Sequence, residues 1–183
     1  MGTARTPPPV KLIVSLLAGD LALLDQAQAA LERAFGPVDW QSQPLPFNHT
    51  DYYTPEHGSG LVRRLVTFQP LVDPGQLAAI KRQTNALEQR WTLGGRRQVN
   101  LDPGYLSLSK LVLATTKDHG HRIYLGQGIY AEVTLRFQDG AFRAWPWTYP
   151  DYASPHYAML LAGVRERYKA QLREIPPKKE CRA

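Results

Sequence analysis

The sequence predicts a single α+β domain: a ferredoxin-like βαββαβ sandwich with an antiparallel C-terminal strand extension and a closing helix. Apolar runs and helical periods follow one another as strand, helix, strand, strand, helix, strand over residues 10–116. Later segments are short strands separated by turn residues, and a helical period returns only before Pro176. Hydrophobic residues make up 43% and charged residues 21% of the 183 residues, which suits one globular domain. In this arrangement the helices are expected on one face of an antiparallel sheet.

The first half of the chain supplies a strand, a helix and two further strands. The run from Lys11 to Ala18 is continuously apolar, which is typical of a buried strand. Asp20 is a good N-cap for a helix that Gly36-Pro37 would end. Residues 38–45 can form a strand, and the prolines Pro44 and Pro46 place it at an edge. A further strand is expected over 61–68.

The second half begins with a clear helix start and continues mainly as strands. Asp73-Pro74-Gly75-Gln76 offers an N-cap, a proline at the first helical position and a capping-box glutamine, and Gly94-Gly95 would stop this helix. Strands are expected over 106–116, 121–125, 129–137 and 141–145. Ser154-Pro155 would cap the closing helix. We therefore expect a flexible leader over 1–9, one domain over 10–173 and a disordered charged tail over 174–183.

Composition restricts the location and the class of partner. No apolar run is long enough to cross a bilayer, and the one cysteine, Cys181, cannot form an internal disulfide, so we expect a cytoplasmic protein without a membrane partner. Half of the net charge of +6 comes from residues outside 10–172, which argues against a strongly basic nucleic-acid binder. The sequence also lacks a G-x-x-x-x-G-K-[ST] phosphate loop.

The strand over 129–137 carries the most informative polar pattern. Alternation places Ile129, Ala131, Val133, Leu135 and Phe137 on one apolar face, and Tyr130, Glu132, Thr134 and Arg136 on the other. If this polar face adjoins the neighbouring strands, Lys110, Lys117, Arg122 and Tyr124 could hold a phosphate or carboxylate while Glu132 acts as a base or metal ligand. A solvated sheet face with cross-strand ion pairs explains the same pattern.

Two turn-like segments add candidates. In Asn100-Leu101-Asp102-Pro103-Gly104-Tyr105 the Asp-Pro-Gly unit predicts a turn, and Asn100 and Asp102 could bind magnesium or a ribose or could simply close that turn. In 117–122, Asp118 and His121 could share a metal, or His121 could act as a general acid or base. A turn rich in solvated charge is the alternative there.

Aromatic residues gather at 50–56 and 145–152. Interleaved with arginine such residues could stack on bases, whereas rigid loops packed over a core edge are the alternative interpretation.

Five stretches together resemble a bacterial family known as domain of unknown function 4416. They are TDYYTPEHG (50–58), RRQVNLDPGYL (96–106), KLVLATTKD (110–118), HRIYLGQGIYAEVTL (121–135) and WTYPDY (147–152). Members sometimes carry a GTP-binding label. The resemblance implies methionine in place of His57 and an aromatic residue in place of His119, which argues against essential roles for both histidines.

The resemblance extends the set of candidate site residues. The matching polar positions are Asp51, Tyr53, Glu56, Asn100, Asp102, Tyr105, Lys110, Lys117, Asp118, His121, Arg122, Tyr124, Glu132 and Asp151. We expect this cluster to bind or process a phosphorylated small ligand or nucleotide, with Glu132, Asp102 and His121 in catalytic roles and Mg²⁺ as a possible cofactor. A non-catalytic RNA-binding module and a protein-interaction domain are the alternatives. The sequence gives no oligomeric state.

Overall fold

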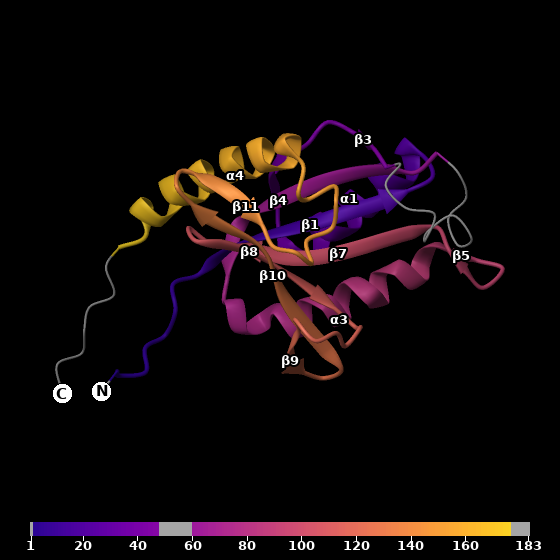
Figure 1. The fold of residues 1–183 in the computed structure, drawn as a ribbon. Helices are drawn as coiled ribbons and strands as arrows, with labels where there is room; N and C mark the ends of the chain where they lie inside the picture. The colour runs from indigo at the N-terminus through magenta and orange to yellow at the C-terminus, as the bar shows by residue number, and fades with distance from the viewer. Residues whose placement is uncertain (1, 48–59, 177–183) are drawn as a thin grey trace.

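The computed structural model describes residues 2–47 and 60–176, and these residues form an α+β fold (Figure 1). Its three helices are α1 (Leu21–Phe35), α3 (Leu77–Glu88) and α4 (Pro155–Glu174). Its long strands are β1 (Val10–Ala18), β4 (Val62–Val72), β7 (Val99–Leu106), β8 (Lys110–Thr115) and β10 (Ile129–Gln138). The shorter strands are β2 (Val38–Gln41), β3 (Leu45–Pro46), β5 (Thr92–Leu93), β6 (Arg96–Arg97), β9 (Ile123–Gly126) and β11 (Ala141–Ala144). Within the described ranges, no helix combines the length and the apolar composition that crossing a bilayer requires.

Nine of the strands form one antiparallel sheet. Its order is β11-β10-β8-β7-β1-β4-β2, with β3 paired to β4 and β9 paired to β10. β1 is central and pairs with β4 on one side and with β7 on the other. The edge position that Pro44 and Pro46 predict is confirmed, because β2 and β3 each pair with β4 alone.

Helices cover both faces of the sheet, so the expectation of helices on one face is wrong. Alternate β1 residues such as Leu12 and Val14 pack against α1 and α3, whereas Ile13 belongs to a second core cluster that α4 covers. In Figure 1, α4 and α3 lie on opposite sides of the strands. The reason is the alternation of side chains along β1, which buries apolar residues on both faces and so requires a cover on each.

The predicted helix caps at Asp20 and Ser154 are confirmed, whereas α3 starts at Leu77, after the predicted position, and the Gln76 side chain makes no capping hydrogen bond with any described residue. The Asp20 carboxylate accepts a hydrogen bond from the Leu23 N–H at 2.8 Å, and the Ser154 hydroxyl accepts one from the Tyr157 N–H at 3.3 Å. Asp73 caps the short 3-10 turn Pro74–Gln76 that leads into α3. The end of α3 differs from the expectation. The helix stops at Glu88, and Gly94-Gly95 instead form the turn of the small β5-β6 hairpin, where both glycines have positive φ.

The apolar alternation in β10 is interrupted by a bulge. Val133 pairs with Val112 and Leu135 with Leu111, so β10 contains one extra residue there. As a result, Ile129 and Ala131 pack in a cluster with α3 residues, whereas Leu135 packs in the cluster under α4. The prediction of one apolar face from Ile129 to Phe137, and of one polar face from Tyr130 to Arg136, is therefore wrong.

The Asp102-Pro103-Gly104 segment is not a turn but the middle of β7. Asp102 pairs with Ser15 and Gly104 with Ile13 of β1, and Gly104 also pairs with Leu113 of β8. A Cβ atom on Gly104 would clash with the Val112 carbonyl oxygen. Glycine is required here by the close approach of two strands, and not by a turn conformation.

Candidate functional site

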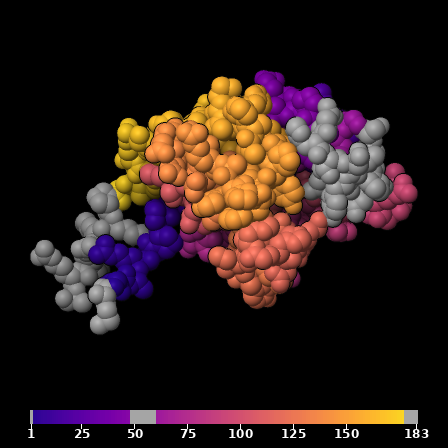
Figure 2. Space-filling view, in the orientation of Figure 1, coloured from indigo at the N-terminus to yellow at the C-terminus, as the bar shows by residue number. Residues whose placement is uncertain are grey.

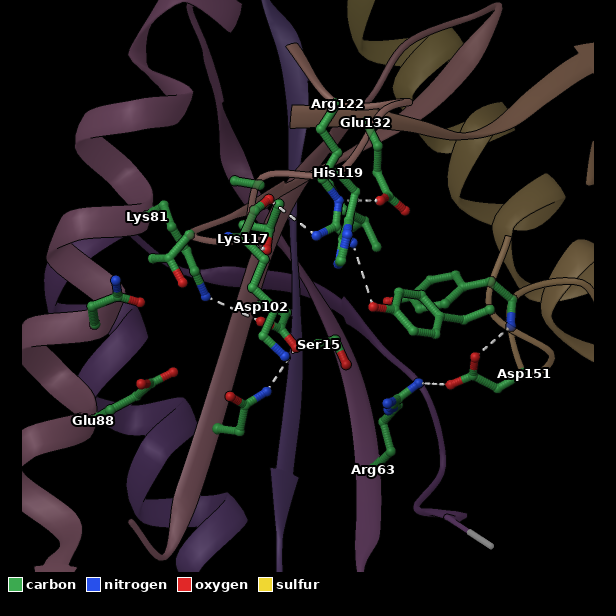
Figure 3. A pocket seen from close by; sticks show the side chains of 18 of the residues that line it. Ser15, Arg63, Lys81, Glu88, Asp102, Lys117, His119, Arg122, Glu132 and Asp151 are labelled. Atoms are coloured by element: carbon green, nitrogen blue, oxygen red, sulfur yellow. Dashed lines mark hydrogen bonds and ion pairs between the residues drawn. The ribbon is translucent and has the colours of Figure 1, made fainter. Parts of the chain in front are cut away.

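A cavity of about 820 Å³ opens beside β7, between α3 and the loop that leads into α4. Figure 3 shows side chains from both borders and from the sheet pointing into this space. Its charged lining residues are Arg63, Lys81, Glu88, Arg97, Asp102, Lys117, Arg122, Glu132 and Asp151. A volume of this size matches a typical small-molecule site, roughly 300–1,000 Å³.

The cavity forms where β7 and β8 separate. β8 pairs with β7 only from Gly104 to Leu106, so the earlier part of β7 has a free edge on that side. Two side chains of α3 take the place of a neighbouring strand: the Leu101 N–H donates to Glu88 at 2.7 Å, and the Leu101 carbonyl accepts from Lys81 Nζ at 2.9 Å. Alternate residues of a strand direct their backbone groups to the same side, so Pro103, which lacks an N–H, falls on this free edge without loss of a sheet hydrogen bond.

Asp102 and Lys81 form the ion pair at the floor of the cavity. Lys81 Nζ lies 3.0 Å from Asp102 Oδ1, and the Asn100 amide donates to Asp102 Oδ2 at 2.7 Å. Burial alone would raise the pKa of Asp102, but the charge and hydrogen bond of Lys81, together with the Asn100 hydrogen bond, outweigh it and lower the pKa. Asp102 is therefore a carboxylate at neutral pH.

Glu88 is the most deeply buried carboxyl group of the site. It is 1% exposed, and besides the Leu101 N–H it accepts a hydrogen bond from Arg97 at 3.0 Å. Burial raises the pKa of Glu88, and the nearby Lys81 and the Leu101 hydrogen bond offset only part of this effect. Glu88 and Asp102 therefore have pKa values displaced in opposite directions within one cavity.

Arg63 lines the opposite wall. Its guanidinium forms a hydrogen-bonded ion pair with Asp151 and lies over the Phe47 ring, 4.3 Å from the ring centroid. The residue is 5% exposed, yet among the described residues its Nε atom has no hydrogen-bond partner. A buried donor left unpaired costs about 1–3 kcal/mol. A ligand acceptor in the cavity would satisfy it.

Glu132 is held by three neighbours. Its Oε2 accepts from Arg122 Nε at 2.8 Å and lies 3.1 Å from His121 Nε2, while Thr134 donates to Oε1 at 3.3 Å. Arg122 also donates to the Lys117 carbonyl at 3.1 Å, and so joins β10 to the segment over 116–122. In this structure the carboxylate positions Arg122 and His121.

The cavity brings together part of the predicted set. Asn100, Asp102, Lys117, Arg122, Glu132 and Asp151 line it, and His121 contacts Glu132 from outside the lining. Lys110, Tyr105 and Tyr124 lie elsewhere. Lys110 pairs with Arg136 at the far end of β8, Tyr105 packs with the residues under α3, and the Tyr124 ring lies tilted against the Tyr130 ring. Asp51, Tyr53 and Glu56 lie outside the described residues.

Several lining residues were not predicted, and two of the signals were present in the sequence. Lys81, Asn85 and Glu88 follow the i, i+4, i+7 spacing of a helix face, beside the apolar face that buries Ile80 and Leu87. Arg63 and Arg64 interrupt the apolar part of β4, and a charged residue in such a run is seldom buried without a partner. The lining also includes Ser15, Arg97 and His119.

Metal binding has little support from the side chains. Within residues 2–47 and 60–176, no group of three or more His, Cys, Asp and Glu side chains could hold a metal ion. Asp102 is bonded to Lys81 and Asn100, and Glu132 to Arg122 and His121. Both carboxylates are therefore already engaged by cationic or hydrogen-bonding side chains in this structure.

One protein family, described as Domain of unknown function (DUF4416), matches residues 8–168. Comparison with curated proteins and with solved structures gives no match.

Proposed function

Because the chain belongs to the DUF4416 family, which is of unknown function, we propose a function from the cavity itself: it binds a phosphorylated small molecule. The observation that carries this proposal is the surplus of cationic hydrogen-bond donors on the cavity wall. Arg63, Lys81, Arg97, Lys117 and Arg122 contribute five positive charges, against four carboxylates from Glu88, Asp102, Glu132 and Asp151. The cations come from separate segments of the chain, yet they all face one space.

The donors exceed the acceptors that the described residues supply. Arg63 Nε is buried without a partner. Lys81 Nζ carries three N–H groups and uses two of them, one for the Leu101 carbonyl and one for Asp102. A phosphate offers several strong acceptor oxygens, and hydrogen bonds to charged donors are worth about 1.5–3 kcal/mol each.

The acidic residues shape the site for such a ligand. Each carboxylate is bonded to a cation, namely Asp102 to Lys81, Asp151 to Arg63, Glu88 to Arg97 and Glu132 to Arg122. These pairs fix the cations in place before a ligand arrives, which lowers the entropic cost of binding. The site is therefore organised in advance as an anion receptor.

Calorimetric titration of the full chain with ribose 5-phosphate, ribose and inorganic phosphate tests this proposal. We expect ribose 5-phosphate to bind and ribose not to bind, with an affinity that falls as salt is added because the contact is charged. Equal binding of ribose and ribose 5-phosphate, or no binding of either phosphate compound, would contradict the proposal.

We also propose that β1, α1, β2, β4, α3 and β7 form a ferredoxin-like βαββαβ unit. The antiparallel order β7-β1-β4-β2 and the common core cluster that α1 and α3 share on one face of β1 support it. An experimental structure in which β7 or β2 occupied another place in the sheet would contradict this assignment.

A further inference from the structure

Four aromatic rings form a continuous stack that ends at the cavity. Trp145 and Trp147 have ring centroids 5.1 Å apart and planes 5° apart, Trp147 and His121 are 5.3 Å and 13° apart, and His121 and His119 are 6.0 Å and 13° apart. We call these four residues the ring stack. Figure 2 shows its two segments side by side on one face, with the segment after β10 (orange) above the segment around β9 (salmon). Offset parallel rings at such distances attract one another.

The ring stack is anchored at the end far from the cavity. The Arg136 guanidinium lies over Trp145, 4.2 Å from the ring centroid, as in a cation–π contact. Trp147 Nε1 donates to the Val133 carbonyl at 3.2 Å, and Thr148 donates to the Thr134 carbonyl at 2.6 Å. Both acceptors lie at the β10 bulge, so the bulge fixes the loop that carries the tryptophans.

The histidine rings are fixed at the cavity end. His121 Nε2 lies 3.1 Å from the Glu132 carboxylate, so the imidazole is held between this contact and the Trp147 face. The His119 carbonyl accepts a hydrogen bond from the Arg122 N–H at 2.8 Å, which closes the turn between the two histidines. The His121 ring is therefore oriented before any ligand is present, and the turn fixes the backbone that carries His119.

His119 is the terminal ring, and it lines the cavity. The residue is exposed, and among the described residues no ring stacks on it beyond His121. Lys117 lies two residues before it, and both lie with Arg122 at one end of the space shown in Figure 3. A flat aromatic surface and a group of cations thus face the same cavity.

We propose that His119 stacks on the base of a nucleoside phosphate whose phosphate lies among the cations of the cavity. This inference rests on the proposed function, since it assigns the remainder of the phosphorylated ligand. A base would extend the ring stack by one member, and the parallel planes of the four rings set its orientation. The cavity volume of about 820 Å³ is that of a small-molecule site, which favours a free nucleotide over a nucleic-acid strand.

The test compares nucleoside 5′-monophosphates with ribose 5-phosphate, which has the same sugar and phosphate but no base. The wild-type protein should bind a monophosphate roughly 5- to 150-fold more tightly, the gain that one base–aromatic stack provides. His119→Ala should lose this gain and keep the affinity for ribose 5-phosphate, whereas His119→Phe should retain it. His156→Ala is the matched control, because His156 is exposed on α4 and outside the lining, and both affinities should stay unchanged.

Each failure has a separate meaning. Equal binding of monophosphate and ribose 5-phosphate by the wild type, or an undiminished preference in His119→Ala, would overturn the stacking role and leave the phosphate site intact. Absence of binding by all phosphate compounds would overturn the proposed function itself. Tighter binding of a single-stranded RNA oligonucleotide than of any monophosphate would overturn the choice of a free nucleotide.

Discussion

Lys81 Nζ lies 3.0 Å from Asp102 Oδ1, and this ion pair joins α3 to the free edge of β7. The Lys81 ammonium also donates to the Leu101 carbonyl, so one cation satisfies both a carboxylate and a backbone group that β8 does not reach. The pair thus fixes α3, one wall of the cavity, to the floor that β7 provides. Lys81 therefore both completes the edge of β7 that β8 leaves unpaired and holds the Asp102 carboxylate in the cavity.

Replacement of Lys81 by methionine should destabilise the fold. The substitution keeps the length of the side chain but leaves the Asp102 carboxylate without its cation and the Leu101 carbonyl without its donor. We expect a loss of about 1–3 kcal/mol in the free energy of unfolding, measured by urea denaturation. Arg82→Met is the control, since the hydrogen bond that Arg82 makes among the described residues, to Gln127, is exposed. Equal stability of Lys81→Met and wild type would show that the pair does not support the fold.

Asp102 should make the protein sensitive to acid. Its pKa is lowered in the folded chain, so its stabilising contribution is complete above the ordinary aspartate pKa of about 3.9 and is lost as the pH falls through the folded-state value. The difference in unfolding free energy between wild type and Asp102→Asn should therefore shrink as the pH falls below about 4. A difference that stays constant across this interval would contradict the assignment.

Glu88 should change the stability with pH in the opposite direction to Asp102. Burial raises its pKa in the folded state, so the stability it contributes is fully present below the ordinary glutamate pKa of about 4.3 and is lost as the pH rises through the raised value. Glu88→Gln keeps an oxygen that accepts from the Leu101 N–H and carries no charge to desolvate. Unfolding measured across this pH range should show the variant gaining stability relative to wild type as the pH rises. A gain in the reverse direction would mean that Arg97 and Lys81 outweigh the effect of burial.

Two identical substitutions should have opposite effects. Gly104→Ala should destabilise by about 1–3 kcal/mol, because the added Cβ meets the Val112 carbonyl of the neighbouring strand. Gly163→Ala should stabilise by about 0.5–1 kcal/mol, because Gly163 lies within α4 with no atom near its Cβ position. Thermal unfolding of both variants checks this pair. A stable Gly104→Ala protein would show that β7 and β8 do not approach as closely as described.

The sequence predicts local structure well where a single local pattern, such as a capping residue or an apolar run, determines it. The Asp20 and Ser154 caps and the buried β1 strand follow directly from side-chain chemistry and periodicity. It fails where tertiary contacts override a local preference. The sequence Asp102-Pro103-Gly104 predicts a turn, but these residues lie in a strand. Pro103 lies on a free strand edge, where its missing N–H costs no sheet hydrogen bond, and Gly104 allows β8 to approach closely. The β10 bulge shifts the alternation by one residue, which no residue type in that strand reveals.

Only part of the candidate site was predicted, because tertiary contacts bring the remaining residues to it. Lys117, Arg122 and Glu132 belong to neighbouring segments, so local reasoning could associate them. Arg63, Lys81 and Glu88 come from β4 and α3, and only the folding of both elements around β7 brings them to the same cavity. Lys110 shares a strand with lining residues, yet it lies at the opposite end of β8.

Titration of ribose 5-phosphate into the variants Lys117→Gln and Lys110→Gln tests the central claim most directly. Both substitutions remove one positive charge, but Lys117 lines the cavity and Lys110 does not. We expect Lys117→Gln to weaken binding roughly 10- to 100-fold, as for loss of one charged hydrogen bond, and Lys110→Gln to bind like the wild type. Equal affinities in the two variants, or a greater loss in Lys110→Gln, would contradict the assignment of the cavity as the phosphate site.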